Sequence, residues 1–416
     1  MSTANTTQTP SSTFLSEAKG AMNDVRRAIA ALVEAVDANP QQPQEISRRF
    51  GLDKTLTWKI ARFLGDDDMF AAASHLPGRA SVRNLVEALV KGGAAADRAA
   101  SVLEAMDRFE SIVATHAGDR ETFEIMLGSA SDGLARRRGE AARKQLYQGA
   151  SAIWGVQARV HMSMHMIAPS AEQPDTIDIA VICGFIDFRR LRPNVSWTVS
   201  RRGTFIKDGT PQPSPNTVPL DPSIPVTAPP VLAEFCSDPI PPIRAVFQPA
   251  SQLTRFELEP GPVGNTASAN CILGWIARSQ VSRYRREGDE IGENIVRLST
   301  PAELLYHDLY VHKDLGFAID PPPRLHIYSE LPGGPSYPHD GLDAGRLPMP
   351  DDVIDLGETP TGAVTTDIPG YPDMVSLAIK RLGHGPADFH GFRCKLRFPP
   401  IPTLALLRYP LPERPR

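Results

Sequence analysis

Seven residues between positions 48 and 62 combine a spacing and a chemistry that suit contact with a polyanion. They share an expected outward placement and side chains able to reach phosphates: Arg48, Arg49, Lys54, Thr55, Trp58, Lys59 and Arg62. Lysine and arginine neutralise phosphate charge, and a helix that presents them on one face can track a charged backbone or enter a groove. Against Glu45 and Asp53, the segment carries a local positive charge although the whole chain has a formal charge of −4.

The elements that must position these residues are two short helices over Pro43 to Leu64, joined by a tight turn at Gly51. Four apolar residues fall where a helix-turn-helix unit buries its contacts: Ile46, Phe50, Leu52 and Ile60. Small Ser47 stands where the helices cross, and Gly51 stands where the turn needs a positive φ. We expect a further helix over Phe14 to Ala38, because its apolar residues recur every three or four positions.

On these residues, the part from about Phe14 to Phe70 resembles the helix-turn-helix DNA-binding unit of bacterial transcription regulators, closest to the IclR and MarR types. The resemblance implies duplex DNA as a partner and a recognition helix from Asp53 to Leu64 in the major groove. It places four side chains of the recognition helix near bases and phosphates: Lys54, Thr55, Lys59 and Arg62. It places Arg48 and Arg49, from the preceding helix, toward the DNA backbone. Two residues depart from the usual pattern: Thr57 replaces a buried aliphatic residue, and Trp58 is bulky for a groove-facing position.

A winged-helix domain would add a β-hairpin after the recognition helix. No alternating strand pair stands between Gly65 and Gly78, so the wing is missing or replaced by helix. The IclR resemblance would also imply an effector-binding α/β domain downstream. The proline-rich remainder does not look like one, and the resemblance carries over no ligand class.

Proline divides the chain into two kinds of structure. Only four of the 40 prolines precede residue 169, and proline interrupts helices, so the first part can be helical and the second mostly cannot. The predicted fold class is α+β: an all-α, winged-helix-like helix-turn-helix region followed by a larger, mainly β region. The expected organisation is a disordered tail (1–13), a helix-turn-helix unit (14–75), a helical region (76–153) and a Pro-rich β domain with one or two inserted helices (154–416).

From Trp154 onward, an alternation of apolar and polar residues predicts strands. They are expected at residues 154–166, 177–183, 195–199 with 204–207, 244–247, 255–258, 325–328 and 392–398. Residues 269–287 and 374–382 are expected to be helices, and residues 209–242 a Pro-rich connector without a packing pattern. The four scattered cysteines and the polar N-terminus favour reduced thiols in a cytoplasmic protein.

Three groups of side chains could hold a metal ion, although each has a simpler interpretation. They are the pair His161 and His165, the group His384, Asp388 and His390, and the group His307, Asp308 and His312. Alternation places the first pair on one face of a strand, where a solvated or hydrogen-bonded pair is commoner than a metal site, and the other groups more often satisfy their own turns. We therefore expect no metal and no cofactor.

The leading hypothesis is a non-enzymatic DNA-binding regulator, an oligomer whose β region serves oligomerisation or sensing. The sequence contains no serine-nucleophile, phosphate-binding or dinucleotide-binding motif, which removes the usual reasons for proposing an enzyme. The alternative is a structural or assembly protein, a lattice or shell subunit whose helical region packs on partner proteins with Trp58 as an anchor.

Overall fold

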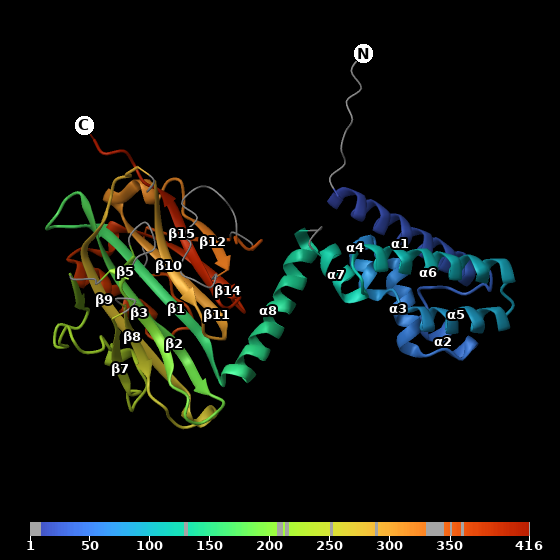
Figure 1. The fold of residues 1–416 in the computed structure, drawn as a ribbon, viewed down its shortest axis with the longest axis horizontal. Helices are drawn as coiled ribbons and strands as arrows, with labels where there is room; N and C mark the ends of the chain where they lie inside the picture. Colours follow the sequence, from blue (N-terminus) through green and yellow to red (C-terminus); the bar gives the residue numbers. More distant parts are fainter. Residues whose placement is uncertain are drawn as a thin grey trace, which may run out of the picture. The chain divides into compact units, whose positions relative to one another are not determined.

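The computed structural model (Figure 1) describes residues 10–128, 132–205, 211–212, 216–249, 253–287, 290–329, 345–349, 352–358 and 362–415. The chain divides into two compact units, one ending at Gly139 and one running from Glu140 to Arg416. A helical region is followed by a β-rich region with a mixed sheet, so the predicted α+β class is confirmed.

In the described part of the first region, eight α-helices and one 3₁₀ helix follow one another. They are α1 (Pro10–Glu34), α2 (Pro43–Phe50), α3 (Lys54–Gly65), α4 (Met69–Ala72), α5 (Arg79–Lys91), α6 (Ala96–His116), α7 (Arg120–Gly128) and α8 (Asp132–Trp154), with the 3₁₀ helix η1 (Ala73–His75) after α4. Helix α1 begins at Pro10, inside the range expected to be a tail, and residues 1–9 lie outside the described chain.

The core of the helical unit confirms the periodicity of the first helix. Met22, Val25 and Ile29 are fully buried in one apolar cluster with α3, α5, α6 and α7. Phe109 and Phe123 meet edge to face, with ring centroids 5.4 Å apart. Burying this stripe is what makes the helices persist, since short isolated helices are marginal in water.

The winged-helix expectation finds no support. All of residues 10–128 are described, and this range contains no strand. Helix α4 and η1 follow α3 directly, with Asp68 as the N-cap whose carboxylate accepts from the amide of Phe70 at 2.9 Å. The place of a wing is taken by helix because apolar Met69, Ala72 and Ala73 bury against the same core.

The second region, where the structure describes it, is built from strands, the α-helix α9 and short 3₁₀ helices. The strands are β1 (Val156–Pro169), β2 (Thr176–Arg190), β3 (Trp197–Arg202), β4 (Thr204–Phe205), β5 (Pro211–Gln212), β6 (Thr217–Pro219), β7 (Ile243–Gln248), β8 (Leu253–Leu258), β9 (Ala269–Ser282), β10 (Ile291–Leu298), β11 (Ala302–His312), β12 (Arg324–Ser329), β13 (Ile354–Gly357), β14 (Phe389–Arg397) and β15 (Thr403–Pro410). The helices are η2 (Ala233–Phe235), η3 (Asn265–Ala267), η4 (Lys313–Ala318), α9 (Tyr371–Leu382) and η6 (Pro386–Asp388).

A seven-stranded mixed sheet organises this unit. Its order is β13-β14-β11-β1-β2-β9-β6, with β1 and β11 parallel and the other pairs antiparallel. Helix α9 covers one face and buries Met374, Val375 and Ile379 against the even-numbered residues of β1. The small sheets β10-β15-β12 and β3-β8-β7 bury apolar side chains against the other face. Both faces are therefore covered, which suits the apolar character of the central strands.

The helix predicted over residues 269–287 is wrong, since β9 occupies most of that range. Residues 271–276 are all buried, because β9 pairs with β2 and is covered on both faces. A strand buried on both faces shows no alternation, so its apolar run is easily mistaken for a helix. The helix expected at residues 374–382 is confirmed by α9.

The Pro-rich connector expected over residues 209–242 packs in part, contrary to the prediction. Leu220 and Leu232 are buried against β9. Both leucines approach Gly274, where an added Cβ would lie 2.7 Å from a methyl carbon of each. Glycine at this position thus allows the connector to lie close to the sheet.

A buried ion pair joins β11, β14 and α9. Arg393 donates to the carboxylate of Asp308 at 2.8 Å and 3.1 Å, and the hydroxyl of Tyr371 donates to the same carboxylate. The hydroxyls of Tyr310 and Tyr371 lie 2.6 Å apart. Burial, reinforced by Asp308, raises the pKa of Tyr371 well above its ordinary value, so it remains a neutral donor.

We predict that Asp308→Asn strongly destabilises the second unit. The substitution leaves the guanidinium of Arg393 buried without its charge partner, which typically costs about 3–5 kcal/mol. Urea denaturation followed by circular dichroism would measure the loss. The matched control is Asp175→Asn, which removes an exposed pair with Arg414 and should cost about 1 kcal/mol or less. Equal losses in the two variants would contradict the assignment.

Candidate nucleic-acid interface and buried cavity

The turn between α2 and α3 has the predicted conformation. Gly51 has φ 65° and ψ 29°, which is the left-handed region. The amide of Leu52 donates to the carbonyl of Ser47 at 3.0 Å, and the hydroxyl of Ser47 donates back to the carbonyl of Leu52 at 2.7 Å. Asp53 then caps α3, its carboxylate accepting from the amide of Leu56 at 3.1 Å. These contacts define the angle at which α3 leaves α2.

Helix α3 separates its buried and exposed residues cleanly. Leu56, Thr57, Ile60 and Phe63 are buried against the helical core. Five residues share the opposite, exposed face: Lys54, Thr55, Trp58, Lys59 and Arg62. At about 100° per residue, these five positions span an arc of roughly 140°. The structure thus brings together on one face the α3 residues singled out from the sequence.

Thr57, which departs from the usual aliphatic residue, is accommodated inside the helical unit. Its hydroxyl donates to the carbonyl of Lys54 at 3.0 Å, and the residue is only 2% exposed. Threonine in a helix satisfies its hydroxyl in this way. The departure therefore leaves the packing of α3 intact.

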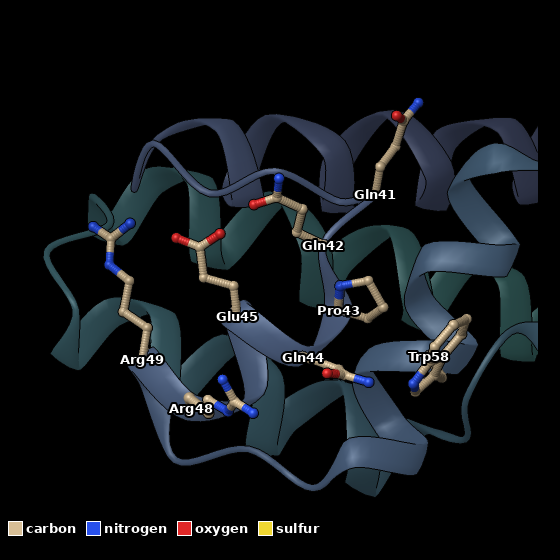
Figure 2. Close-up of a pocket in the computed structure, with 8 residues that line it drawn as sticks. All are labelled: Gln41, Gln42, Pro43, Gln44, Glu45, Arg48, Arg49 and Trp58. Carbon is tan, nitrogen blue, oxygen red and sulfur yellow. The ribbon is translucent and has the colours of Figure 1, made fainter.

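A shallow groove lies beside the exposed face of α3 (Figure 2). It is lined by Gln41, Gln42, Pro43, Gln44, Glu45, Arg48, Arg49 and Trp58, with a volume of about 660 Å³. Figure 2 shows Trp58 reaching this groove from α3, while the other residues come from α2 and the loop before it. The indole is 48% exposed, so it offers an apolar surface next to the basic residues.

The basic residues of the interface differ in whether they already contact other residues of the protein. Arg49 donates to the carbonyl of Asp37 at 3.3 Å and lies over the ring of Phe50, 4.9 Å from its centroid. Arg48, Lys54, Lys59 and Arg62 are exposed, and among the described residues none of them forms an ion pair. Four cations are therefore available to an incoming anion, and Arg49 is partly held by its own chain.

The second unit contains a cavity of about 350 Å³ between the seven-stranded sheet and the strands β3 and β10. His161, Arg202 and Thr217 are among the residues that line it, and each has one buried side-chain atom without a hydrogen-bond partner among the described residues: Nδ1 of His161, Nη1 of Arg202 and Oγ1 of Thr217. Apolar side chains such as Val199 and Trp275 form much of the remaining wall. A cavity with this lining suits a small amphipathic molecule.

His161 and His165 lie on the same face of β1, as predicted, and both line the cavity. His165 pairs with the side chains of Asn294 at 3.0 Å and Ser163 at 3.1 Å. Burial, assisted by the neighbouring His307, lowers the pKa of His161 to about 4 and that of His165 to about 3. Both imidazoles are therefore neutral at pH 7.

The two larger histidine groups proposed from the sequence are not assembled as such. His307 contacts the backbone of Asn294 and Ser163, whereas Asp308 projects to the other side of β11 and binds Arg393. His390 pairs with Asp355 at 2.6 Å. Adjacent residues of a strand point to opposite faces, which separates neighbours in the sequence.

Sequence reasoning missed the cavity residues Ser163, Arg202, Thr217 and Asn294. They come from four different strands, β1, β3, β6 and β10. Only Ser163 falls within the alternating stretch that contains His161 and His165; the other three lie far from it in the sequence, so no local motif joins the set. Among the described residues, no helix combines the length and apolar character needed to cross a bilayer, and all four cysteines are free thiols.

Comparison with known proteins adds no identification: no family model, no curated protein and no solved structure matches the chain. The resemblance to IclR and MarR regulators thus stays a prediction based on the residues of α2 and α3.

We predict that Gly51→Val destabilises the helical unit by roughly 1–3 kcal/mol, because a β-branched residue is strained in the left-handed region. No atom lies within 4 Å of an added Cβ, so the loss would reflect backbone strain and not a clash. Gly20→Ala within α1 is the control, and it should stabilise the helix by about 1 kcal/mol. Thermal melting measured by circular dichroism tests both, and an unchanged Gly51→Val melting curve would refute the turn assignment.

We predict that the second unit loses stability as the pH falls from 6.5 toward 4. In that window the unfolded chain protonates His161, whose ordinary pKa is 6.5, while the folded chain keeps it neutral. His161→Leu should therefore reduce the slope of stability against pH by up to about 1.4 kcal/mol per pH unit. At pH 7 the variant should be about as stable as the parent, because Nδ1 has no partner to lose among the described residues. Parallel pH profiles from denaturation curves would contradict the prediction.

Proposed function

We propose that the protein binds duplex DNA through the exposed face of α3 and the adjoining end of α2, as a transcription regulator. The observation that carries this proposal is the placement of Lys54, Thr55, Lys59 and Arg62 on one solvent-facing side of a capped helix. Cationic side chains on such a face neutralise phosphates, and their hydrogen-bond donors reach base edges.

The proposed contact divides its residues by role. Lys54, Thr55, Lys59 and Arg62 approach bases and phosphates in the major groove, with Trp58 packing beside them. Arg48 contacts the DNA backbone from α2, and Arg49 joins it if DNA replaces the carbonyl of Asp37 as its partner. Hydrogen bonds to phosphates position such a helix, and base contacts then give it sequence preference.

Charge limits the proposed contact to this surface. The chain is acidic overall, and Asp66, Asp67 and Asp68 follow α3 directly. These carboxylates would repel phosphates beyond the C-terminal end of α3, so the N-terminal part of the helix should lie deepest in the groove, with Lys59 and Arg62 nearer its phosphates. This orientation is also the usual one for recognition helices.

The second unit is proposed to sense a small molecule and to support oligomerisation. The cavity beside β1 supports a sensing role, because apolar walls with a few polar side chains, among them Ser163 and Asn294, are the usual lining of a small-molecule site. Strand β7 is an edge strand of its described sheet, and Phe247 on it is 54% exposed. An exposed apolar edge of this kind favours pairing between copies.

The same exposed residues keep an assembly protein as the second candidate function. Trp58 borders a groove whose lining includes Glu45 and neutral glutamines, and an aromatic anchor in such a setting also suits a protein partner. In that case α2 and α3 would pack on another protein and the edge strands would build a lattice.

The decisive experiment is DNA binding by fluorescence anisotropy, with the full chain and a pool of random-sequence duplexes. Parent affinity should fall on the order of 10³-fold between 50 and 200 mM salt if about six phosphates are engaged. The double variant Lys59→Ala with Arg62→Ala should bind more weakly. The slope of log affinity against log salt should decrease by about two, one for each lost phosphate contact.

The matched control is the double variant Lys91→Ala with Arg98→Ala. It removes the same charge from exposed positions on α5 and α6. It should retain the parent salt slope, and both double variants should keep the parent circular dichroism spectrum. Equal weakening of DNA binding by the two double variants would mean that only net charge matters, which would contradict the proposed surface. Sedimentation of the protein as large assemblies without DNA would support the second candidate function.

A further inference from the structure

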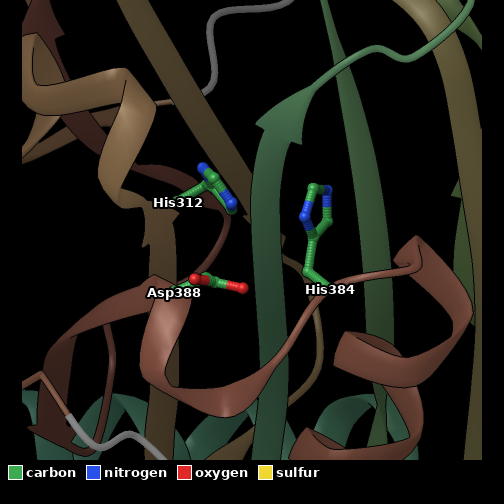
Figure 3. Close-up of side chains that lie close together, drawn as sticks. All are labelled: His312, His384 and Asp388. Atoms are coloured by element: carbon green, nitrogen blue, oxygen red, sulfur yellow. The ribbon is translucent and has the colours of Figure 1, made fainter.

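Three potential metal ligands converge at one end of the seven-stranded sheet (Figure 3). His312 comes from the end of β11, His384 from the loop after α9 and Asp388 from η6. Their ligand atoms all lie within 4.8 Å of one another, and Figure 3 shows the three side chains directed at a common space. In the sequence these residues fall into two separate groups, His312 with His307 and Asp308, and His384 and Asp388 with His390.

Backbone contacts hold the ligands in place. His312 is paired with Phe389 across β11 and β14, so Asp388 is held one residue before the paired position. Gly383 ends α9 in the left-handed region, and the amide of His384 donates to the carbonyl of Ile379 at 3.3 Å. The carboxylate of Asp388 accepts from the amide of Gly385 at 3.0 Å, which closes the loop.

The histidine rings are close but not hydrogen-bonded to each other. The ring centroids of His312 and His384 lie 4.4 Å apart, and among the described residues the nitrogens of His384 have no hydrogen-bond partner. His312 is buried and the other two ligands are partly buried. Two imidazoles facing a carboxylate in this manner have lone pairs available for a cation.

We propose that His312, His384 and Asp388 bind a divalent transition-metal ion of the Zn²⁺ or Co²⁺ class, with solvent completing the coordination. Imidazole nitrogen favours such ions over Mg²⁺ and Ca²⁺, which prefer all-oxygen sites. Three protein ligands plus water form a common coordination set for zinc. The site is independent of the proposed DNA contact, and it would tie the α9–β14 loop to β11.

Neighbouring groups are compatible with this coordination. Lys313 donates to Oδ1 of Asp388 at 2.6 Å and the amide of Gly385 donates to Oδ2 at 3.0 Å, and each carboxylate oxygen keeps a second lone pair that can bind the ion. Nδ1 of His312 accepts from the amide of Asp314 at 3.2 Å and lies 3.7 Å from its carboxylate. Binding of the ion by Nε2 would move the proton to Nδ1, which would then release the amide of Asp314 and donate to the carboxylate of the same residue. Carboxylate partners of this kind commonly orient metal-binding histidines.

Cobalt titration of chelator-treated full-length protein provides the test, using Co²⁺ alone as the probe. One ion per chain should bind and produce the intense visible absorption of four- or five-coordinate cobalt, and Zn²⁺ should displace it. Loss of a residue that only orients a metal ligand typically weakens metal binding by roughly 10–100-fold. His384→Ala and Asp388→Asn each remove a ligand itself, so each should weaken cobalt binding by more than that. Unchanged circular dichroism would show that both variants remain folded.

The matched control is His390→Ala. His390 also pairs with a carboxylate, that of Asp355, but it belongs to no group of three ligands among the described residues. It should leave the cobalt spectrum and affinity unchanged, and Zn²⁺ should raise the melting temperature of the control and parent but not of His384→Ala. Absence of the cobalt absorption, or equal loss in the control, would overturn the proposal.

Discussion

The buried pair of Asp308 and Arg393 is the interaction on which the β-rich unit most depends. It joins neighbouring strands β11 and β14, and the hydroxyl of Tyr371 connects the same carboxylate to the first turn of α9. A charge buried at this depth is tolerated only while its partner remains. The pair therefore specifies how α9 lies on the sheet, and with it where the loop carrying His384 and Asp388 returns toward His312.

The helical unit depends on a different kind of constraint, which is local. Gly51 and Asp53 define the turn and the start of α3, while Ile60 and Phe63 anchor the helix to the core. With one side of α3 buried, its basic residues have only solvent to face. The proposed DNA contact follows from this division, because a chain of net negative charge can attract a polyanion only through a local cationic surface.

Much of the fold was predictable wherever a pattern had a clear period. The stripe of α1 and the alternation of β1 both gave the correct element, because each buries one side and exposes or hydrogen-bonds the other. Prediction failed for β9, whose burial on both faces erases the alternation. The expectation that helix replaces a wing after α3 is confirmed by α4 and η1. The cavity was not predictable, since the strands that line it come from distant parts of the sequence and meet only in the folded sheets.

By itself, the sequence determined the helical and strand periods, the turn at Gly51 and the outward set on α3, because these depend on residues within a few positions of one another. Only the tertiary structure decided which histidines meet. The alternation of β11 directs His307 and Asp308 to opposite faces of the sheet. His390 pairs with Asp355, and His312 lies beside His384 and Asp388. Such meetings depend on strand pairing between distant segments, and that pairing is selected by burial of the whole sheet and not by local spacing.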